Sequence, residues 1–159
     1  MRILLLDEDK ATYEVLNEVA QLSGSEIIHI TSMEEAKEFV KQNTDIDGIV
    51  AEQRLKGRPT WEIINYMKDE HLKLIPFIIL SKKLTPDERE FYEHLGVTAI
   101  LEKPFNPLEV FTEILEHLKE TKGEEYIKER LEEEEVDKNA LAKIIEKLIS
   151  FLKSLFKRK

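Results

Sequence analysis

Residues 48–57 read GIVAEQRLKG, in which the apolar run from Gly48 to Ala51 ends on the carboxylate of Glu52. Four further apolar runs are spread over the first two thirds of the chain: Ile3 to Leu6, Ile27 to Ile30, Ile75 to Leu80 and Thr98 to Leu101. Most of these runs are continuous rather than alternating, which is typical of strands that are covered on both faces. The stretches between them carry apolar residues at helical spacing, so we expect strand and helix to alternate five times.

Repeated strand–helix units predict a parallel α/β sheet with right-handed crossovers and helices on both faces. Local signals mark where individual helices begin. Thr85 and Glu88 fit a capping box, and Pro107 lies in the first turn after Asn106. Because the composition changes beyond Lys122, we predict one domain over residues 1–121 and an extension of one or two helices over residues 122–159.

The composition narrows the class of protein. The chain has 159 residues, of which 42% are hydrophobic, enough for one domain with a core and a modest appendage. A net charge of -9 disfavours nucleic-acid binding by the molecule as a whole, and the lack of cysteine excludes disulfides and thiolate metal sites. A strand that starts at Arg2 leaves no room for a signal peptide, and no apolar run is long enough to span a bilayer. We therefore expect a cytoplasmic protein.

Polar side chains follow four of the five predicted strands. Asp7 and Glu8 follow the first strand, Glu52 the third, Ser81 the fourth and Lys103 the fifth. In open α/β sheets, functional groups collect beyond the carboxyl ends of the strands. Three acids, a hydroxyl and a lysine are therefore expected to share one crevice.

The segments that carry these residues resemble the receiver domain of bacterial two-component response regulators. They read ILLLDED, DGIVAEQRLKG, PFIILSK and AILEKPF, and they occur in the family's order at the family's spacing. The resemblance covers about residues 1–120. It implies a flavodoxin-like doubly wound sheet with strand order 2-1-3-4-5, and it implies a histidine kinase or a downstream effector as partner.

The resemblance also implies a mechanism for the conventional members of the family. A phosphoryl group passes from a phosphohistidine to an aspartate at the position of Glu52, and the residues matching Ser81 and Lys103 hold the phosphoryl oxygens. An aromatic side chain at the position of Ile100 then turns inward and changes the surface around the last two strands.

Two residues depart from this pattern, because Glu52 replaces the aspartate and Ile100 replaces the aromatic residue. The extra methylene moves the carboxylate by ~1.5 Å, in a reaction that depends on in-line positioning and in which a ~1 Å misplacement can cost about a hundredfold. Ile100 has no polar tip with which to report the engagement of the hydroxyl. We therefore predict an atypical receiver that is a protein-interaction module and not an enzyme. The alternative is a conventional phosphorelay receiver that accepts phosphate despite Glu52.

The carboxylate of Glu52 has two interpretations. It is either a salt-bridge partner of Lys103, or a built-in substitute for the phosphorylated aspartate that holds the domain near its active arrangement. We favour the simple salt bridge, because the cost of desolvating both ions opposes the attraction between them.

The resemblance also implies a metal site, which conventional receivers use for magnesium. Three carboxylates beside one lysine are expected to attract a divalent cation or to raise the pKa of one carboxyl group. We predict that no cofactor is required and that Mg²⁺ or Mn²⁺ binds weakly, through Glu8, Glu52 and the backbone carbonyl of Arg54.

Two other protein classes could use such a crevice. A flavin carrier needs a hydroxyl-rich turn after the first strand, whereas the DEDK sequence at residues 7–10 repels phosphate. A metal-dependent phosphatase could use the acids, but the receiver pattern explains Ser81 and Lys103 without a new reaction.

The last 23 residues, 137–159, carry seven Lys and Arg against two acids and an apolar face at helical spacing. The face consists of Leu141, Ile144, Ile145, Leu148, Phe151, Leu152 and Leu155. It could pack on its own domain, pair with a second chain as a homodimer, or lie on an anionic membrane. Packing against protein is favoured over a membrane surface, because the face lacks an interfacial tryptophan and follows an acidic EEEE segment.

Overall fold

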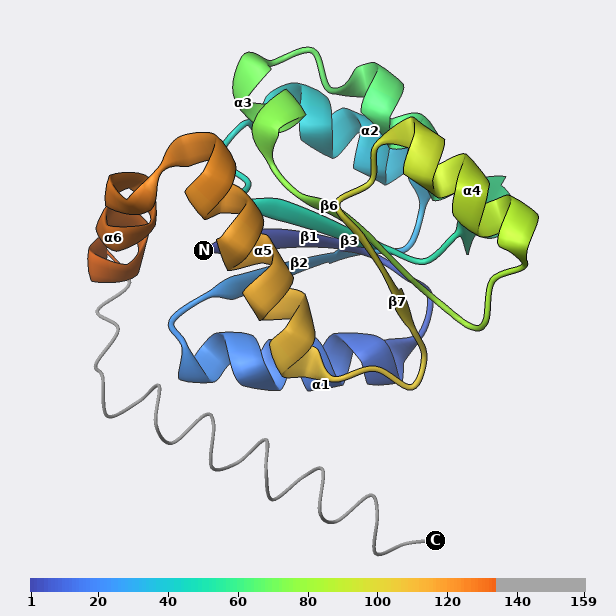
Figure 1. Cartoon of the computed structure of the whole chain (residues 1–159), viewed down its shortest axis with the longest axis horizontal. Helices are drawn as coiled ribbons and strands as arrows, with labels where there is room; N and C mark the ends of the chain where they lie inside the picture. Colours follow the sequence, from blue (N-terminus) through green and yellow to red (C-terminus); the bar gives the residue numbers. More distant parts are fainter. Residues whose placement is uncertain (134–159) are drawn as a thin grey trace, which may run out of the picture.

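The computed structural model describes the backbone of residues 1–133 and the side chains of residues 1–129. A sheet of five parallel strands lies at its centre: β1 (Arg2–Leu6), β2 (Glu26–Ile30), β3 (Gly48–Ala51), β6 (Phe77–Ser81) and β7 (Ala99–Glu102). Their order in the sheet is β2-β1-β3-β6-β7, which is 2-1-3-4-5 when these five strands are counted along the chain (Figure 1). The predicted flavodoxin-like topology is confirmed.

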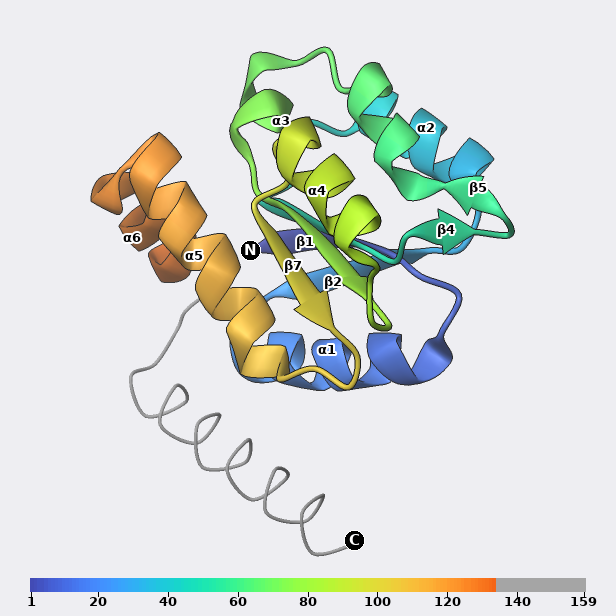
Figure 2. The ribbon, with the colours of Figure 1, turned by 45° about the vertical axis from the view of Figure 1, so that its right-hand side comes forward.

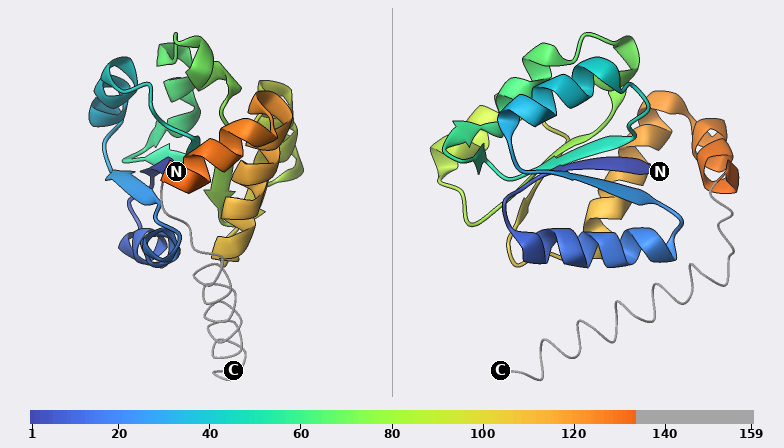
Figure 3. Two further views of the ribbon diagram at one scale, coloured as in Figure 1. Left: turned by 90° about the vertical axis from the view of Figure 1, so that its left-hand side faces the viewer. Right: turned by 180° about the vertical axis from the view of Figure 1, so that it is seen from behind.

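Helices cover both faces of the sheet, as the repeated units predicted. One face is covered by α1 (Lys10–Leu22) and α5 (Pro107–Lys122), and the other by α2 (Met33–Gln42) and α4 (Pro86–Leu95) (Figure 1, Figure 3). The predicted capping box at the start of α4 is present, since the Glu88 N–H donates to Thr85 Oγ1 and the Thr85 N–H donates to Glu88 Oε1. The third connection is less regular, because a 3₁₀ helix, η1 (Thr60–Tyr66), precedes the short α3 (Glu70–Leu74).

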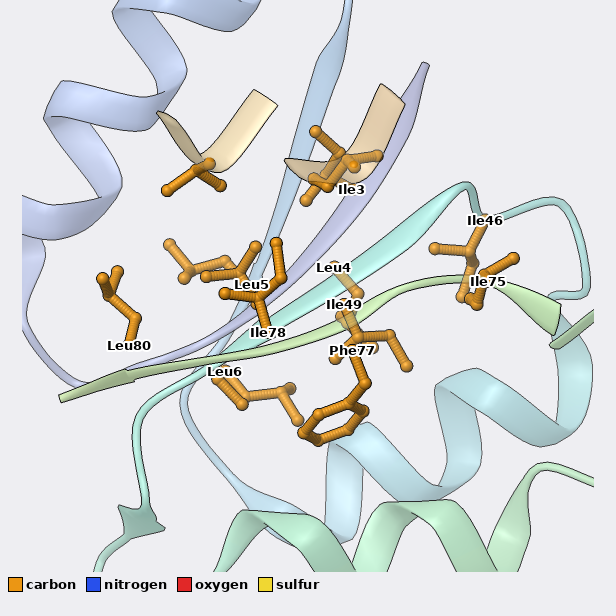
Figure 4. Close-up of a cluster of buried hydrophobic side chains, with 14 of the residues drawn as sticks. Ile3, Leu4, Leu5, Leu6, Ile46, Ile49, Ile75, Phe77, Ile78 and Leu80 are labelled. Carbon is orange, nitrogen blue, oxygen red and sulfur yellow. The ribbon is translucent and has the colours of Figure 1, made fainter. Parts of the chain in front are cut away.

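The continuous apolar runs are explained by burial on both sides of the sheet. Leu5 and Ile78 project toward one face, and Leu6 and Phe77 project toward the other (Figure 4). The side chains of β1 from Ile3 to Leu6 are almost completely excluded from solvent. A strand in this position cannot alternate between apolar and polar residues, which accounts for the pattern in the sequence.

A small hairpin follows β3 directly and was not predicted. It pairs β4 (Arg54–Leu55) with β5 (Arg58–Pro59) in antiparallel register, beyond the carboxyl end of β3 (Figure 2). The two residues of its loop have positive φ angles, 48° at Lys56 and 80° at Gly57. Positive φ at both central positions is the requirement of a type I′ turn, whose twist suits two-residue hairpins.

The extension begins with a helix that packs on the domain. Helix α5 runs to Lys122, so the boundary predicted after residue 121 falls in its last turn, and α6 (Glu124–Glu133) then lies beside α5 and the N-terminus (Figure 1, Figure 3). The predicted apolar face from Leu141 to Leu155 lies outside the described residues. Within the part of the chain that the structure describes, no helix is long and apolar enough to cross a membrane.

Candidate functional site

The ammonium group of Lys103 lies at the centre of the predicted crevice. Lys103 follows β7, and its Nζ lies 2.7 Å from Asp7 Oδ2, 3.2 Å from Glu52 Oε2 and 3.9 Å from Asp9 Oδ2. The carboxyl ends of β1, β3 and β7 therefore bring together residues that are up to 96 positions apart in the chain. The salt bridge predicted between Glu52 and Lys103 is present.

Burial strengthens the electrostatic coupling in this cluster. The side chains of Asp7 and Lys103 are 3% and 15% exposed, whereas that of Glu52 is 23% exposed. Burial lowers the pKa of Lys103, but the hydrogen bond and charge of Asp7, together with the charge of Glu52, raise that pKa by more. The pKa of Lys103 therefore lies above its ordinary value, and the residue is a cation at neutral pH.

Asp9 stands at the edge of the cluster and caps α1. Desolvation raises the pKa of Asp9, but the Ala11 N–H and the charge of Lys103 lower it by more, so that it lies below its ordinary value of 3.8. Asp9 Oδ1 accepts the Ala11 N–H at 2.9 Å. The three predicted acids, Asp7, Glu8 and Glu52, did not include Asp9, although an aspartate directly before an amphipathic helix is a capping signal.

Both oxygens of the Glu52 carboxylate have partners. Oε2 faces Lys103 at 3.2 Å, and Oε1 accepts the backbone N–H of Gln53 at 2.8 Å. The backbone of Glu52 is also fixed, because its N–H donates to Leu6 O at 2.9 Å and its carbonyl accepts the hydroxyl of Thr60. The side chain that replaces the usual aspartate is thus oriented from two directions.

Ser81 reaches the site but bonds to a residue that the sequence analysis did not identify. Its buried Oγ accepts Gln53 Nε2 at 3.2 Å, and the hydroxyl of Tyr92 on α4 donates to Gln53 Oε1 at 3.2 Å. The Lys103 N–H donates to Ser81 O at 2.7 Å and fixes the ends of β6 and β7 relative to each other. No sequence signal marked Gln53 or Tyr92, because a polar residue after a strand and an aromatic residue on an amphipathic helix are both common.

The two side chains predicted to hold a metal ion have other partners in the structure. Glu8 Oε1 accepts the N–H of Lys56 in the β4–β5 hairpin at 3.1 Å, while the carboxylate of Glu52 faces Lys103. Arg54 begins β4, and its Nη1 donates to Gly57 O at 3.3 Å. Among the described residues, no group of three or more His, Cys, Asp or Glu side chains is placed to hold a metal ion.

Ile100 occupies the predicted position in β7. It pairs in register with Ile79 of β6, and its partly buried side chain packs against the hydrophobic core. The following Lys103–Pro104 peptide bond is cis. Since an aliphatic side chain makes no hydrogen bond, Ile100 cannot itself connect to the Ser81 hydroxyl.

Known proteins similar in sequence include regulatory proteins of bacteria. The family model of the response regulator receiver domain matches residues 3–115. The transcriptional regulatory protein YvrH of Bacillus subtilis is 30% identical over 120 residues, which are 75% of this chain and 49% of YvrH. The sensory/regulatory protein RpfC of Xanthomonas campestris is 22% identical over 107 residues, 65% of this chain and 15% of RpfC. The chain thus spans half or less of the length of each of these relatives.

Solved structures agree on the fold. A response regulator receiver domain protein from Clostridium thermocellum superposes with a TM-score of 0.65 at 18% identity, covering 76% of this chain and 96% of that one. The receiver domain of the sensor histidine kinase PA1611 from Pseudomonas aeruginosa, with magnesium coordinated in its active site cleft, gives a TM-score of 0.62 at 19% identity over 74% of this chain and 96% of that one. With the family match extending over most of the sheet and its helices, the chain belongs to the response regulator receiver domain family.

Proposed function

We propose that this chain is an atypical receiver, a cytoplasmic signalling module that acts through contact with other proteins and is not controlled by ordinary aspartyl phosphorylation. The observation that carries the proposal is the bonding of Glu52. At the position where conventional receivers have the phosphoacceptor aspartate, both carboxylate oxygens are bound, one by Lys103 at 3.2 Å and one by the Gln53 N–H at 2.8 Å.

Phosphoryl transfer onto this carboxylate is disfavoured for a geometric reason. An acceptor oxygen must meet the phosphorus in line with the leaving group, and the longer side chain of Glu52 carries that oxygen past the aspartate position. The two bonds to Glu52 then hold the side chain where it is.

The charges in the crevice oppose the reaction as well. Lys103, which in conventional receivers holds a phosphoryl oxygen, is shared by Asp7 at 2.7 Å and Glu52 at 3.2 Å. A phosphoryl group would add negative charge beside Asp7 and Asp9, and it would have to compete for the single ammonium group. We propose that the salt bridge to Glu52 takes the place of that interaction.

The partners we propose are signalling proteins, either a histidine kinase or a downstream effector. We propose that the module is not an enzyme, needs no cofactor and does not bind nucleic acid. Pairing of two chains through the C-terminal extension remains a prediction, because the apolar face of that extension lies outside the described residues.

Intact-mass spectrometry tests the central proposal. The wild type, Glu52→Asp and Glu52→Gln are incubated with a small-molecule phosphodonor such as acetyl phosphate. We expect the mass gain of one phosphoryl group for Glu52→Asp alone, because the rest of the pocket is present, with Glu52→Gln as the control that cannot form an acyl phosphate. Equal labelling of the wild type and Glu52→Asp would support a conventional phosphorelay receiver instead.

Weak binding of Mg²⁺ or Mn²⁺ is a separate proposal. Glu8 already accepts the N–H of Lys56 through one carboxylate oxygen, and the carboxylate of Glu52 faces Lys103, so the affinity should be low. A ligand that binds the folded state alone raises Tm by mass action. We expect millimolar cation to raise the Tm of the wild type more than that of Glu8→Ala, and equal shifts would reject the site.

A further inference from the structure

We infer that Gln53 and Tyr92 are positioning residues that connect the pocket hydroxyl of Ser81 to helix α4, in place of the residue at position 100. The inference rests on the proposed function and deepens it. It names the residues through which a change in the pocket is transmitted to the protein surface in a receiver that lacks the aromatic side chain in β7.

The connection consists of one planar amide held at both ends. Gln53 Nε2 donates to Ser81 Oγ at 3.2 Å, and Gln53 Oε1 accepts from the Tyr92 hydroxyl at 3.2 Å. The backbone N–H of the same residue donates to Glu52 Oε1 at 2.8 Å. Gln53 is therefore bonded to the carboxylate of the pocket, to its hydroxyl and to α4.

Burial makes the two hydroxyls depend on this amide. Ser81 and Tyr92 are 3% and 4% exposed, so water cannot readily replace a lost partner of either group. If the Ser81 hydroxyl turns toward a group in the pocket, the Nε2 end of the amide loses this acceptor and is drawn toward the carboxylate of Glu88 on α4, with which Gln53 also interacts. The Tyr92 hydroxyl then loses its acceptor, and a shift of α4 is the way to restore it.

The connection continues to the molecular surface through aromatic contacts. The ring of Tyr92 meets the ring of Phe91 edge to face, with centroids 5.3 Å apart, and Phe91 meets Trp61 of η1 in the same manner at 5.4 Å. Phe91 is 43% exposed. A movement of α4 therefore changes the surroundings of Trp61, which is the single tryptophan of the chain.

Trp61 fluorescence provides the test, on the full chain and without any ligand. Ser81→Ala is introduced into the wild type, into Tyr92→Phe and into Gln53→Met. Tyr92→Phe keeps the ring and removes the hydroxyl, and Gln53→Met keeps the length and removes the amide. Tyr13→Phe on α1, whose ring stacks on His29, is the matched control.

We expect Ser81→Ala to shift the emission and the iodide quenching of Trp61 in the wild type and in Tyr13→Phe. The shift should be lost in Tyr92→Phe and in Gln53→Met. An equal shift in all backgrounds, or no shift in the wild type, would overturn the inference.

A second measurement covers the case in which Ser81→Ala does not fold. Gln53→Met and Tyr92→Phe should each shift the Trp61 signal, and the double variant should shift it no further, because both changes break the same connection. Additive shifts would contradict the connection. Neither experiment uses a phosphodonor, so labelling of the wild type would reject the proposed function and leave these results unchanged.

Discussion

The two ends of the sheet each bury a carboxylate, but they hold it in different ways. At the carboxyl end, Asp7 is bound by the ammonium of Lys103 at 2.7 Å, and Glu52 and Asp9 compete for the same cation. At the amino end, Asp47 is completely buried, and it accepts the Arg2 N–H at 2.8 Å and the Tyr126 hydroxyl at 2.7 Å.

The difference lies in how the charge of each buried carboxylate is compensated. The bonds of Asp47, the residue before β3, connect it to β1 and to α6 across 45 and 79 positions of the chain, which ties the extension to the domain. Around Lys103, by contrast, three carboxylates share one positive charge, so negative charge is left over. Uncompensated negative charge in a crevice lowers the stability of the folded state. It is useful where a ligand or a conformational switch acts on that charge.

The largest effect expected at either end comes from removing Lys103. Lys103→Met leaves the nearly buried Asp7 without its counter-charge, and breaking a buried ion pair from one side costs about 3–5 kcal/mol of unfolding free energy. Urea denaturation at pH 7 measures this loss. Lys10→Met is the control, because that side chain is 85% exposed in a loose pair with Glu14 and should change stability by less than about 0.5 kcal/mol. Similar losses for both variants would show that Asp7 does not depend on Lys103.

Removing the carboxylate at the amino end should cost less. Asp47→Ala deprives the Arg2 N–H and the Tyr126 hydroxyl of a charged acceptor in a buried place, and we expect a loss of about 2–3 kcal/mol by urea denaturation. A loss larger than that of Lys103→Met would reverse the comparison between the two ends.

The predictability of the two ends also differs, for physical reasons. The sheet, its order and the crevice could be predicted, because continuous apolar runs require burial on both faces and parallel strands bring their carboxyl ends to one edge. The Glu52–Lys103 contact followed from that edge. The role of Asp47 did not follow, because it depends on Tyr126, which lies in a different element 79 positions away.

Several features near the pocket were also not predicted from the sequence, because they depend on short elements or on tertiary packing. The β4–β5 hairpin has only two residues in each strand, too few for a periodic pattern, although the Lys56–Gly57 pair fits its turn. Glu8, which is predicted to hold a metal ion because it follows β1, accepts the Lys56 N–H of this hairpin, a contact that the sequence pattern did not indicate. Gln53 gave no signal because its partners are brought to it by tertiary packing.

The hydroxyl that joins α6 to the domain should contribute a smaller amount. Tyr126→Phe removes one hydrogen bond to a charged acceptor and keeps the ring, so we expect a loss of about 1.5 kcal/mol. Tyr13→Phe on α1 is the matched control and should lose less. Equal losses for the two variants in urea denaturation would mean that the bond to Asp47 adds nothing to the attachment of α6.

The smallest expected effect belongs to Asp9 and depends on pH. Asp9→Ala removes the N-cap of α1 and should cost about 1 kcal/mol at pH 7, whereas Asp9→Asn keeps a capping oxygen and loses only the charge. The pKa of Asp9 lies below 3.8, so the stability that its charge contributes is present above pH 3.8 and is lost as the pH falls through the pKa of the folded state. The difference between the wild type and Asp9→Asn, measured by urea denaturation from pH 7 to pH 3, should therefore shrink on acidification. A stability difference that stays constant or grows on acidification would mean that the Ala11 N–H and the charge of Lys103 do not favour the ionised carboxylate of Asp9. Repulsion from the other acids around Lys103 would then outweigh the attraction of Lys103 for Asp9.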